Sequence, residues 1–248
     1  MDRKLMKLSG IVVVIAFAAT LHGQGRGVRL LGTQAGRPGR VVKGAPYSAD
    51  VSNETTRTLA DGNMIRQTSS GRVYRDSEGR TREESSLEAL GSAARGNAPQ
   101  LAFIFDPAAS ASYVLNLMNH TATRTVWPQV SAGLVNGPNR LARPTQPNTK
   151  TESLGTQVIA GLVADGTRTT MTIPAGQVGN SQALQVVSER WYSPDLQVVV
   201  LSKRTDPRVG ETIYQLANVS RTEPPATLFV TPADFQVSDA KPRMRPQQ

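Results

Sequence analysis

The sequence predicts a mainly β protein: a curved antiparallel sheet, forming a half-barrel or open barrel of about ten to twelve strands, with little helix. Two observations carry this prediction. Short runs that are apolar or that alternate apolar and polar residues recur along the chain, separated by turns rich in Asp, Gly and Pro. The best helical spacing, in "SSLEALGSAAR", is short and interrupted by Gly91. A sheet therefore has to supply the core.

Residues 1–25 are typical of a secretory signal peptide, with basic residues followed by an apolar run and then small residues. The apolar run, Leu8 to Leu21, is shorter than the roughly 20 residues that a spanning helix needs. We therefore expect no transmembrane anchor after removal of the signal. The chain contains no cysteine, so it forms no disulfide. Export without disulfides favours the periplasm of a Gram-negative bacterium, or secretion from it.

The remaining chain divides into three parts by composition. Residues 26–44, rich in Gly and Arg, are expected to form a flexible arm. Residues 45–238 carry the β pattern and are expected to form a single domain, interrupted by a proline-bearing long loop at 128–148. Residues 239–248 are expected to form a disordered basic tail.

The first strands are predicted by alternation and by turn residues. Tyr47 to Ser52 alternates as a half-buried strand does, and the Asp-Gly signal in "ADGN" returns the chain as an antiparallel neighbour. The charged stretch "GRVYRDSEGRTREESS" is interpreted as a hairpin whose turn, Ser77 to Gly79, joins two strands. We expect its opposite charges to pair across these strands, and we assign it no catalytic role.

Later strands are predicted by apolar runs. "LAFIFD", Leu101 to Asp106, is continuously apolar, as expected of a strand covered on both faces. "SYVLNL" and "TATRTVW" continue the meander after turns. The C-terminal third resumes it through "TESLGTQVIAGLVADGTRTTMTI", "ALQVVSERWYS", "LQVVVLSKR" and "TIYQLANVSR".

The residues for most enzyme chemistry are missing from the sequence. Cysteine nucleophiles are excluded, and no serine lies in a GxSxG motif. His120 is interpreted as a solvated turn residue, since a zinc site needs three or four converging ligands. We therefore predict no catalytic residue, metal or cofactor. A carboxylate hydrolase remains an alternative, with these available acids: Glu83, Glu84, Glu152, Asp165, Glu189 and Asp195.

The net charge of +9 favours anionic partners such as an envelope surface. Nucleic acid is not expected as a partner, because the arginines of residues 72–82 are interleaved with acids and the chain lacks a row of aromatic residues on a basic face.

The C-terminal stretches "WYSPDLQVVVLSK", "GETIYQLANVSR" and "LFVTPADFQV" resemble the end of proteins in the periplasmic lipoprotein-carrier (LolA/LolB-like) superfamily. "TESLGTQVIAGLVADGTR" is similar to a pattern of uncharacterised secreted bacterial proteins. The resemblance implies a half-barrel that cups acyl chains or docks a partner. It also implies a groove lined by Phe103, Phe105, Val198 and Val200.

These observations lead to one main hypothesis, a non-catalytic exported protein that binds a lipid-like ligand, a lipoprotein or an envelope protein in the hollow of a curved sheet. The alternative from another class is a cell-envelope or surface interaction module that uses its basic exterior and the long loop.

Overall fold

The computed structural model describes residues 41–86, 100–126 and 148–240. The predicted signal peptide, most of the predicted arm, the stretch 87–99 with the best helical spacing, nearly all of the predicted long loop and residues 241–248 lie outside the described residues.

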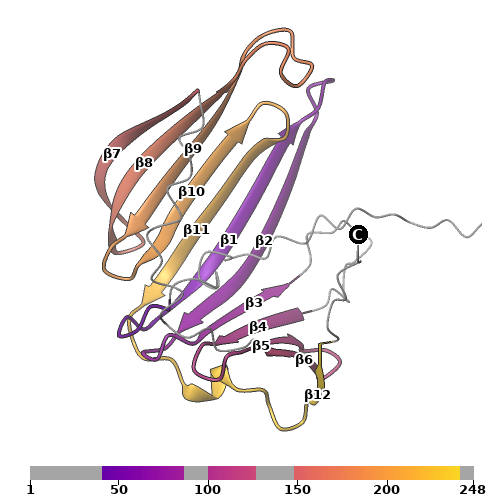
Figure 1. Cartoon of the computed structure of the whole chain (residues 1–248), viewed down its shortest axis with the longest axis vertical. Helices are drawn as coiled ribbons and strands as arrows, with labels where there is room; N and C mark the ends of the chain where they lie inside the picture. The colour runs from indigo at the N-terminus through magenta and orange to yellow at the C-terminus, as the bar shows by residue number, and fades with distance from the viewer. Residues whose placement is uncertain (1–40, 87–99, 127–147, 241–248) are drawn as a thin grey trace, which may run out of the picture.

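Within the described residues, twelve strands form one open sheet, which confirms the predicted curved, mainly antiparallel architecture (Figure 1). The first meander consists of β1 (Tyr47–Thr58), β2 (Met64–Arg75), β3 (Thr81–Ser86), β4 (Gln100–Asp106), β5 (Ala111–Asn116) and β6 (Thr121–Val126). The second consists of β7 (Thr149–Ile159), β8 (Leu162–Ile173), β9 (Leu184–Ser193), β10 (Val198–Asp206) and β11 (Gly210–Ser220). A 3-10 turn, η3 (Ala226–Phe229), and β12 (Gln236–Asp239) complete the described chain.

The two meanders become one sheet because β11 pairs with β1, giving the order β12-β6-β5-β4-β3-β2-β1-β11-β10-β9-β8-β7. In this pairing Val51 lies opposite Leu216 and Asn53 opposite Tyr214. The last described strand, β12, pairs with β6 in parallel, whereas the other strand pairs of the described residues are antiparallel. The ends of the described chain thus lie at the middle and at one edge of the sheet.

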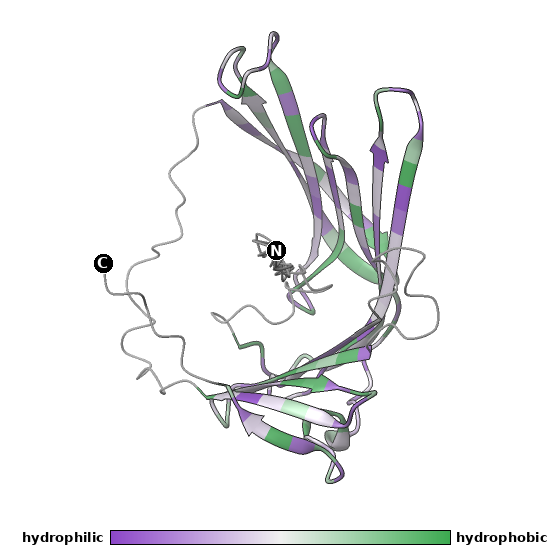
Figure 2. Ribbon diagram, turned by 90° about the vertical axis from the view of Figure 1, so that its right-hand side faces the viewer, coloured by the Kyte–Doolittle hydropathy of each residue, from purple (hydrophilic) through white to green (hydrophobic). Residues whose placement is uncertain are grey.

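The sheet curves strongly, and Figure 2 shows it from the side as an open arc. Register shifts interrupt β1 near Ala49, β7 near Leu154 and β10 near Val200. Such bulges bend a strand and increase its twist. The Arg75 guanidinium on β2 donates a hydrogen bond to the Leu196 carbonyl in the β9–β10 turn, although β1 and β11 lie between these elements. The face that carries Arg75 is therefore the concave one.

The main hydrophobic core occupies one end of this concave face. Alternation along β1 places Tyr47, Ala49 and Val51 on it, and long strands from both meanders add the other members. The buried cluster consists of Tyr47, Ala49, Val51, Val73, Leu162, Ala164, Trp191, Leu196, Val198, Val200 and Leu216. Arg75 closes over it, with its guanidinium carbon 4.8 Å from the centre of the Tyr47 ring.

A second, smaller core lies on the opposite, convex face, where Ala102, Ile104, Leu115 and Ala122 are buried. The C-terminal segment, residues 221–239, contacts this face. Phe235 packs on the cluster, and Arg82 donates a hydrogen bond to the Leu228 carbonyl at 3.0 Å. Arg124 and Asp239 join β6 to β12 through an ion pair of 2.7 Å. The chain thus covers the convex side of its own short strands.

The β2–β3 hairpin has the predicted turn, but its charges follow the prediction only in part. Arg80 forms an ion pair with Asp76 across the turn, whereas the other pairs differ from the prediction. Asp76 is buried in the turn and accepts a hydrogen bond from the Arg80 amide at 2.8 Å. Arg72 pairs with Asp50 on β1, and Arg82 pairs with Glu84 on its own strand. The register explains the difference, because it sets Glu83 opposite Val73 and turns that acid toward the concave face.

Gly166 on β8 lies directly opposite Trp191 on β9, and the indole occupies the space above it. A Cβ at position 166 would stand 2.6 Å from the indole Cζ3 atom. Since Trp191 belongs to the main core, it has little room to move.

We therefore expect Gly166→Ala to lower the free energy of unfolding by about 1–3 kcal/mol, measured by urea denaturation. In a Trp191→Leu background the same change should cost less, because the clash is relieved. An equal cost in both backgrounds would show that the indole is not the cause.

Candidate functional site

Beyond the main core, the concave face continues across the short strands β3 to β5 as a strip of apolar side chains that includes one acid. The register places Val73 on β2, Glu83 on β3, Phe103 on β4 and Val114 on β5 side by side. Cross-strand partners share a face, so these four side chains form one transverse row. Phe103 is half-buried and Val114 is 39% exposed. One acid thus lies within an otherwise apolar strip.

Glu83 is an unusual member of this row. Its Oε1 atom is enclosed and finds no hydrogen-bond partner among the described residues. Burial raises the pKa of its carboxyl from 4.5 to about 8, so the group is mainly protonated at neutral pH. Buried polar groups in proteins are nearly always hydrogen-bonded, because leaving one unpaired is costly.

Two tyrosines near Glu83 show the same desolvated surroundings. Burial raises the pKa of Tyr47 to about 12, with Arg75 opposing the rise and Glu83 adding to it. Burial likewise raises the pKa of Tyr214 well above its usual range, and the charges of Tyr47 and Glu83 add to that effect. Glu83 therefore lies next to the end of the concave face from which water is excluded.

The four residues predicted to line a groove separate into two pairs. Phe103 and Phe105 lie half-buried on β4, on the face of Glu83. Val198 and Val200 lie on β10 inside the main core, where Val200 is fully buried. Four strands, β3, β2, β1 and β11, lie between the pairs in the sheet. Their shared role in binding a ligand stays a prediction.

The predicted apolar strand "LAFIFD" has one fully buried side. Ala102 and Ile104 are buried in the convex-face core, whereas Leu101, Phe103 and Phe105 on the other side are half-buried. The concave side of β4 is thus the less covered one.

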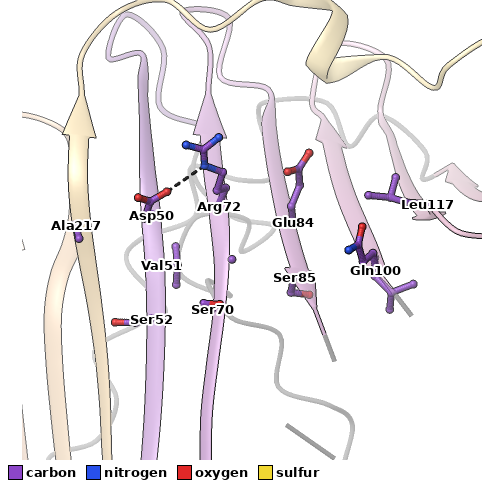
Figure 3. Close-up of a pocket in the computed structure, with 12 residues that line it drawn as sticks. Asp50, Val51, Ser52, Ser70, Arg72, Glu84, Ser85, Gln100, Leu117 and Ala217 are labelled. Atoms are coloured by element: carbon purple, nitrogen blue, oxygen red, sulfur yellow. Dashed lines mark hydrogen bonds and ion pairs between the residues drawn. The ribbon is translucent and has the colours of Figure 1, made fainter. Parts of the chain in front are cut away.

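A hollow of about 550 Å³ lies at the middle of the sheet (Figure 3). Across it runs a row of charged residues, in which Arg72 stands between Asp50 and Glu84 in the strand register. Arg72 donates a hydrogen bond from Nε to Asp50 at 3.0 Å, and Asn218 donates to the same carboxylate at 2.7 Å. Hydrogen bonds from Asn218 and then Arg72 hold the pKa of Asp50 below its usual range. The charges here are compensated within the protein.

His120 occupies a turn, as predicted, with 56% of its side chain exposed. Its Nδ1 atom lies 2.7 Å from an Asp234 carboxylate oxygen, and its ring stacks on Phe235 with centroids 5.2 Å apart. It therefore fastens the C-terminal segment. In the described ranges, no three His, Asp or Glu side chains are grouped to hold a metal ion.

Sequence reasoning missed the position of Glu83, because it interpreted the acids of this hairpin as solvated. The segment "TREESS" alternates only polar residues, so it does not mark its inner face. The available signal was the turn at Ser77 to Gly79. Pairing the residues outward from this turn, strand against strand, sets Glu83 opposite the apolar Val73.

No family model matches the sequence, and no curated protein matches it. Solved structures do match. An uncharacterized conserved protein from Thermus thermophilus has 14% identity and a TM-score of 0.43, with 79% of this chain and 91% of that chain covered. MucB in the Pseudomonas aeruginosa MucA/MucB complex has 13% identity and a TM-score of 0.43, with 82% and 62% covered.

A LolA superfamily protein from Nitrosomonas europaea, NE2245, is also similar, with 9% identity, a TM-score of 0.33, and 81% of this chain and 98% of that chain covered. The superfamily that the C-terminal stretches resemble is thus represented among the structural matches. The chain spans 62% of the MucB chain in the complex. Among the described residues, no helix has the length and apolar character to cross a membrane.

The burial of Glu83 makes a prediction about stability and pH. Its folded pKa, about 8, lies above its ordinary value of 4.5, so the folded protein keeps a proton that the unfolded chain loses. The free energy of unfolding should therefore fall as the pH rises from 4.5 to 8. Above pH 8, where Glu83 is ionised in both states, this loss of stability should remain constant.

Glu83→Gln removes the loss of stability that ionisation of Glu83 causes. We expect its stability advantage over the native protein to be greater at pH 9 than at pH 4 by roughly 1–3 kcal/mol, measured by urea denaturation. Glu84→Gln, on the opposite face of the same strand, is the matched control and should show no such increase. A pH-independent difference for Glu83→Gln would contradict the burial argument.

Proposed function

We propose that this chain is an exported, non-catalytic binding protein that holds a lipid-like ligand against the concave face of its sheet. The observation that carries the proposal is the contrast between the two faces over the short strands. On the convex side the C-terminal segment packs on the buried cluster, whereas on the concave side Phe103 and Phe105 remain half-buried.

Apolar side chains on a concave strip favour an apolar ligand for a simple reason. Each square ångström of apolar surface removed from water contributes about 25 cal/mol, and each methylene group of an acyl chain about 0.8 kcal/mol. Phe103 and Val114 lie on neighbouring strands, so a chain laid along this row contacts both. A curved sheet surrounds more of a bound ligand with protein surface than a flat sheet would.

The charge and the N-terminal sequence support the environment we propose. The full sequence has a net charge of +9, and residues 1–25 contribute three basic residues and one acid, so the exported chain keeps 9 − 3 + 1 = +7 and is attracted to anionic lipids and envelope surfaces. A signal peptide in residues 1–25 would deliver it to the periplasm or beyond, where such ligands occur.

The proposal is tested by purifying the protein after export from a Gram-negative host and analysing it by native mass spectrometry and solvent extraction. We expect a co-purifying acyl-chain lipid. Phe103→Asp should lose most of this lipid, because a charge then lies on the strip. Val237→Asp is the control, since Val237 is 52% exposed on β12 at the sheet edge.

Two results would overturn the proposal: a native protein that neither carries nor takes up an acyl-chain lipid, or equal retention by both variants. Circular dichroism would verify that Phe103→Asp keeps its sheet.

A further inference from the structure

We propose that the carboxyl group of Glu83 binds the polar head of the ligand by donating a hydrogen bond, which makes the ligand an acyl-chain amphiphile with a carboxylate or phosphate oxygen at its head. This inference rests on the proposed function and adds a head-group site to it. It follows from the position of one enclosed acid on an apolar strip.

The first step concerns the hydrogen bonding of Glu83, whose side chain is half-buried. Its Oε1 atom is enclosed and has no hydrogen bond among the described residues. Arg75, a basic residue on the same concave face, directs its guanidinium to the Ala45 and Leu196 carbonyls. The strand neighbour Arg82 pairs instead with Glu84 at 2.7 Å.

Glu84 provides an internal comparison. It lies next in the chain, alternates to the opposite face and has its arginine partner. Glu83 has Val73 on one side and Phe103 on the other, neither of which can hydrogen-bond through its side chain. An enclosed carboxyl oxygen without a hydrogen-bond partner costs stability, and a bound ligand that hydrogen-bonds to the Glu83 carboxyl would recover that cost.

The second step concerns the chemistry of the head group. A buried carboxyl that keeps its proton at neutral pH is a hydrogen-bond donor, and the pKa of Glu83, about 8, supports that state. A donor O–H to an anionic oxygen forms a short, charge-assisted bond. An ionised Glu83 would repel the same head and would attract an ammonium head instead. The acid therefore accommodates an anion only while it is protonated.

The third step is the placement of the chain. Phe103 adjoins Glu83, and Val114 adjoins Phe103 toward the edge strands. On the other side, Val73 leads into the packed core, which leaves no equivalent exposed apolar surface among the described residues there. A ligand with its head at Glu83 would thus extend its acyl chain over β4 and β5.

The test is a fluorescence titration of the full chain, without its signal segment, with cis-parinaric acid below its micelle concentration at pH 6.5 and 9.5. We expect the native protein to bind about tenfold more weakly at pH 9.5, because Glu83 ionises. Glu83→Gln, which keeps a neutral donor, should bind equally at both pH values. Glu83→Ala should bind about tenfold more weakly at pH 6.5.

Glu84→Gln is the matched control and should reproduce the native pH dependence. Displacement by oleate, by phosphatidylglycerol vesicles and by oleylamine identifies the head. Displacement by oleate alone assigns a free carboxylate, and displacement by the vesicles assigns a lipid phosphate. Stronger displacement by oleylamine at pH 6.5 would overturn the acceptor-head assignment.

The outcomes separate the two proposals. If the native protein binds none of these acyl compounds, the proposed function fails. If it binds cis-parinaric acid with equal affinity in the native, Glu83→Gln and Glu83→Ala forms at both pH values, the role of Glu83 is wrong while the proposed function stands. Circular dichroism at each pH shows whether a variant has kept its fold.

Discussion

The pairing of β1 with β11 is the contact on which the rest of the structure depends. It joins two meanders that would otherwise be separate sheets, and it brings Val51 beside Leu216 in the main core. Because the cluster draws Tyr47 and Val73 from one meander and Trp191 and Ala164 from the other, neither meander could bury its own long strands alone. The pairing also places β2 and the β9–β10 turn in one sheet, where the Arg75 guanidinium donates a hydrogen bond to the Leu196 carbonyl.

The two faces of the sheet bury their apolar surface in different ways. Over the short strands, the convex face is covered by the C-terminal segment, which Arg124, His120 and Arg82 fasten through Asp239, Asp234 and a backbone carbonyl. On the concave face, the curved sheet packs its long strands against one another in the main core. Beyond that core, the same face carries half-buried aromatic residues near Glu83. This asymmetry is the physical basis for proposing that a ligand binds on the concave side.

Much of the fold and little of the site could be predicted from the sequence. Alternation at Tyr47 to Ser52 and turns at Ala60 to Asn63 and Ser77 to Gly79 identify strands, because period-two patterns and turn residues act locally. Phe103 and Phe105 were named as groove residues only because the resemblance to the lipoprotein-carrier superfamily implied a groove. Glu83 was not, since its burial depends on the residues of β2 and β4 that flank it. The charge pairs of the hairpin were predicted only in part, because Arg80 pairs with Asp76 across the turn whereas Arg72 pairs with an acid on β1.

The sequence by itself determined a mainly β chain, the number of strands within a narrow range, the absence of disulfides and the turn that sets the β2–β3 register. Only the tertiary structure decided that β11 returns to β1, that β12 runs parallel to β6, and that one acid of a charged hairpin lies enclosed between Val73 and Phe103. The reason is that strand formation follows local pattern and turn chemistry, whereas strand partners and the burial of a polar side chain are set by residues far away in the chain.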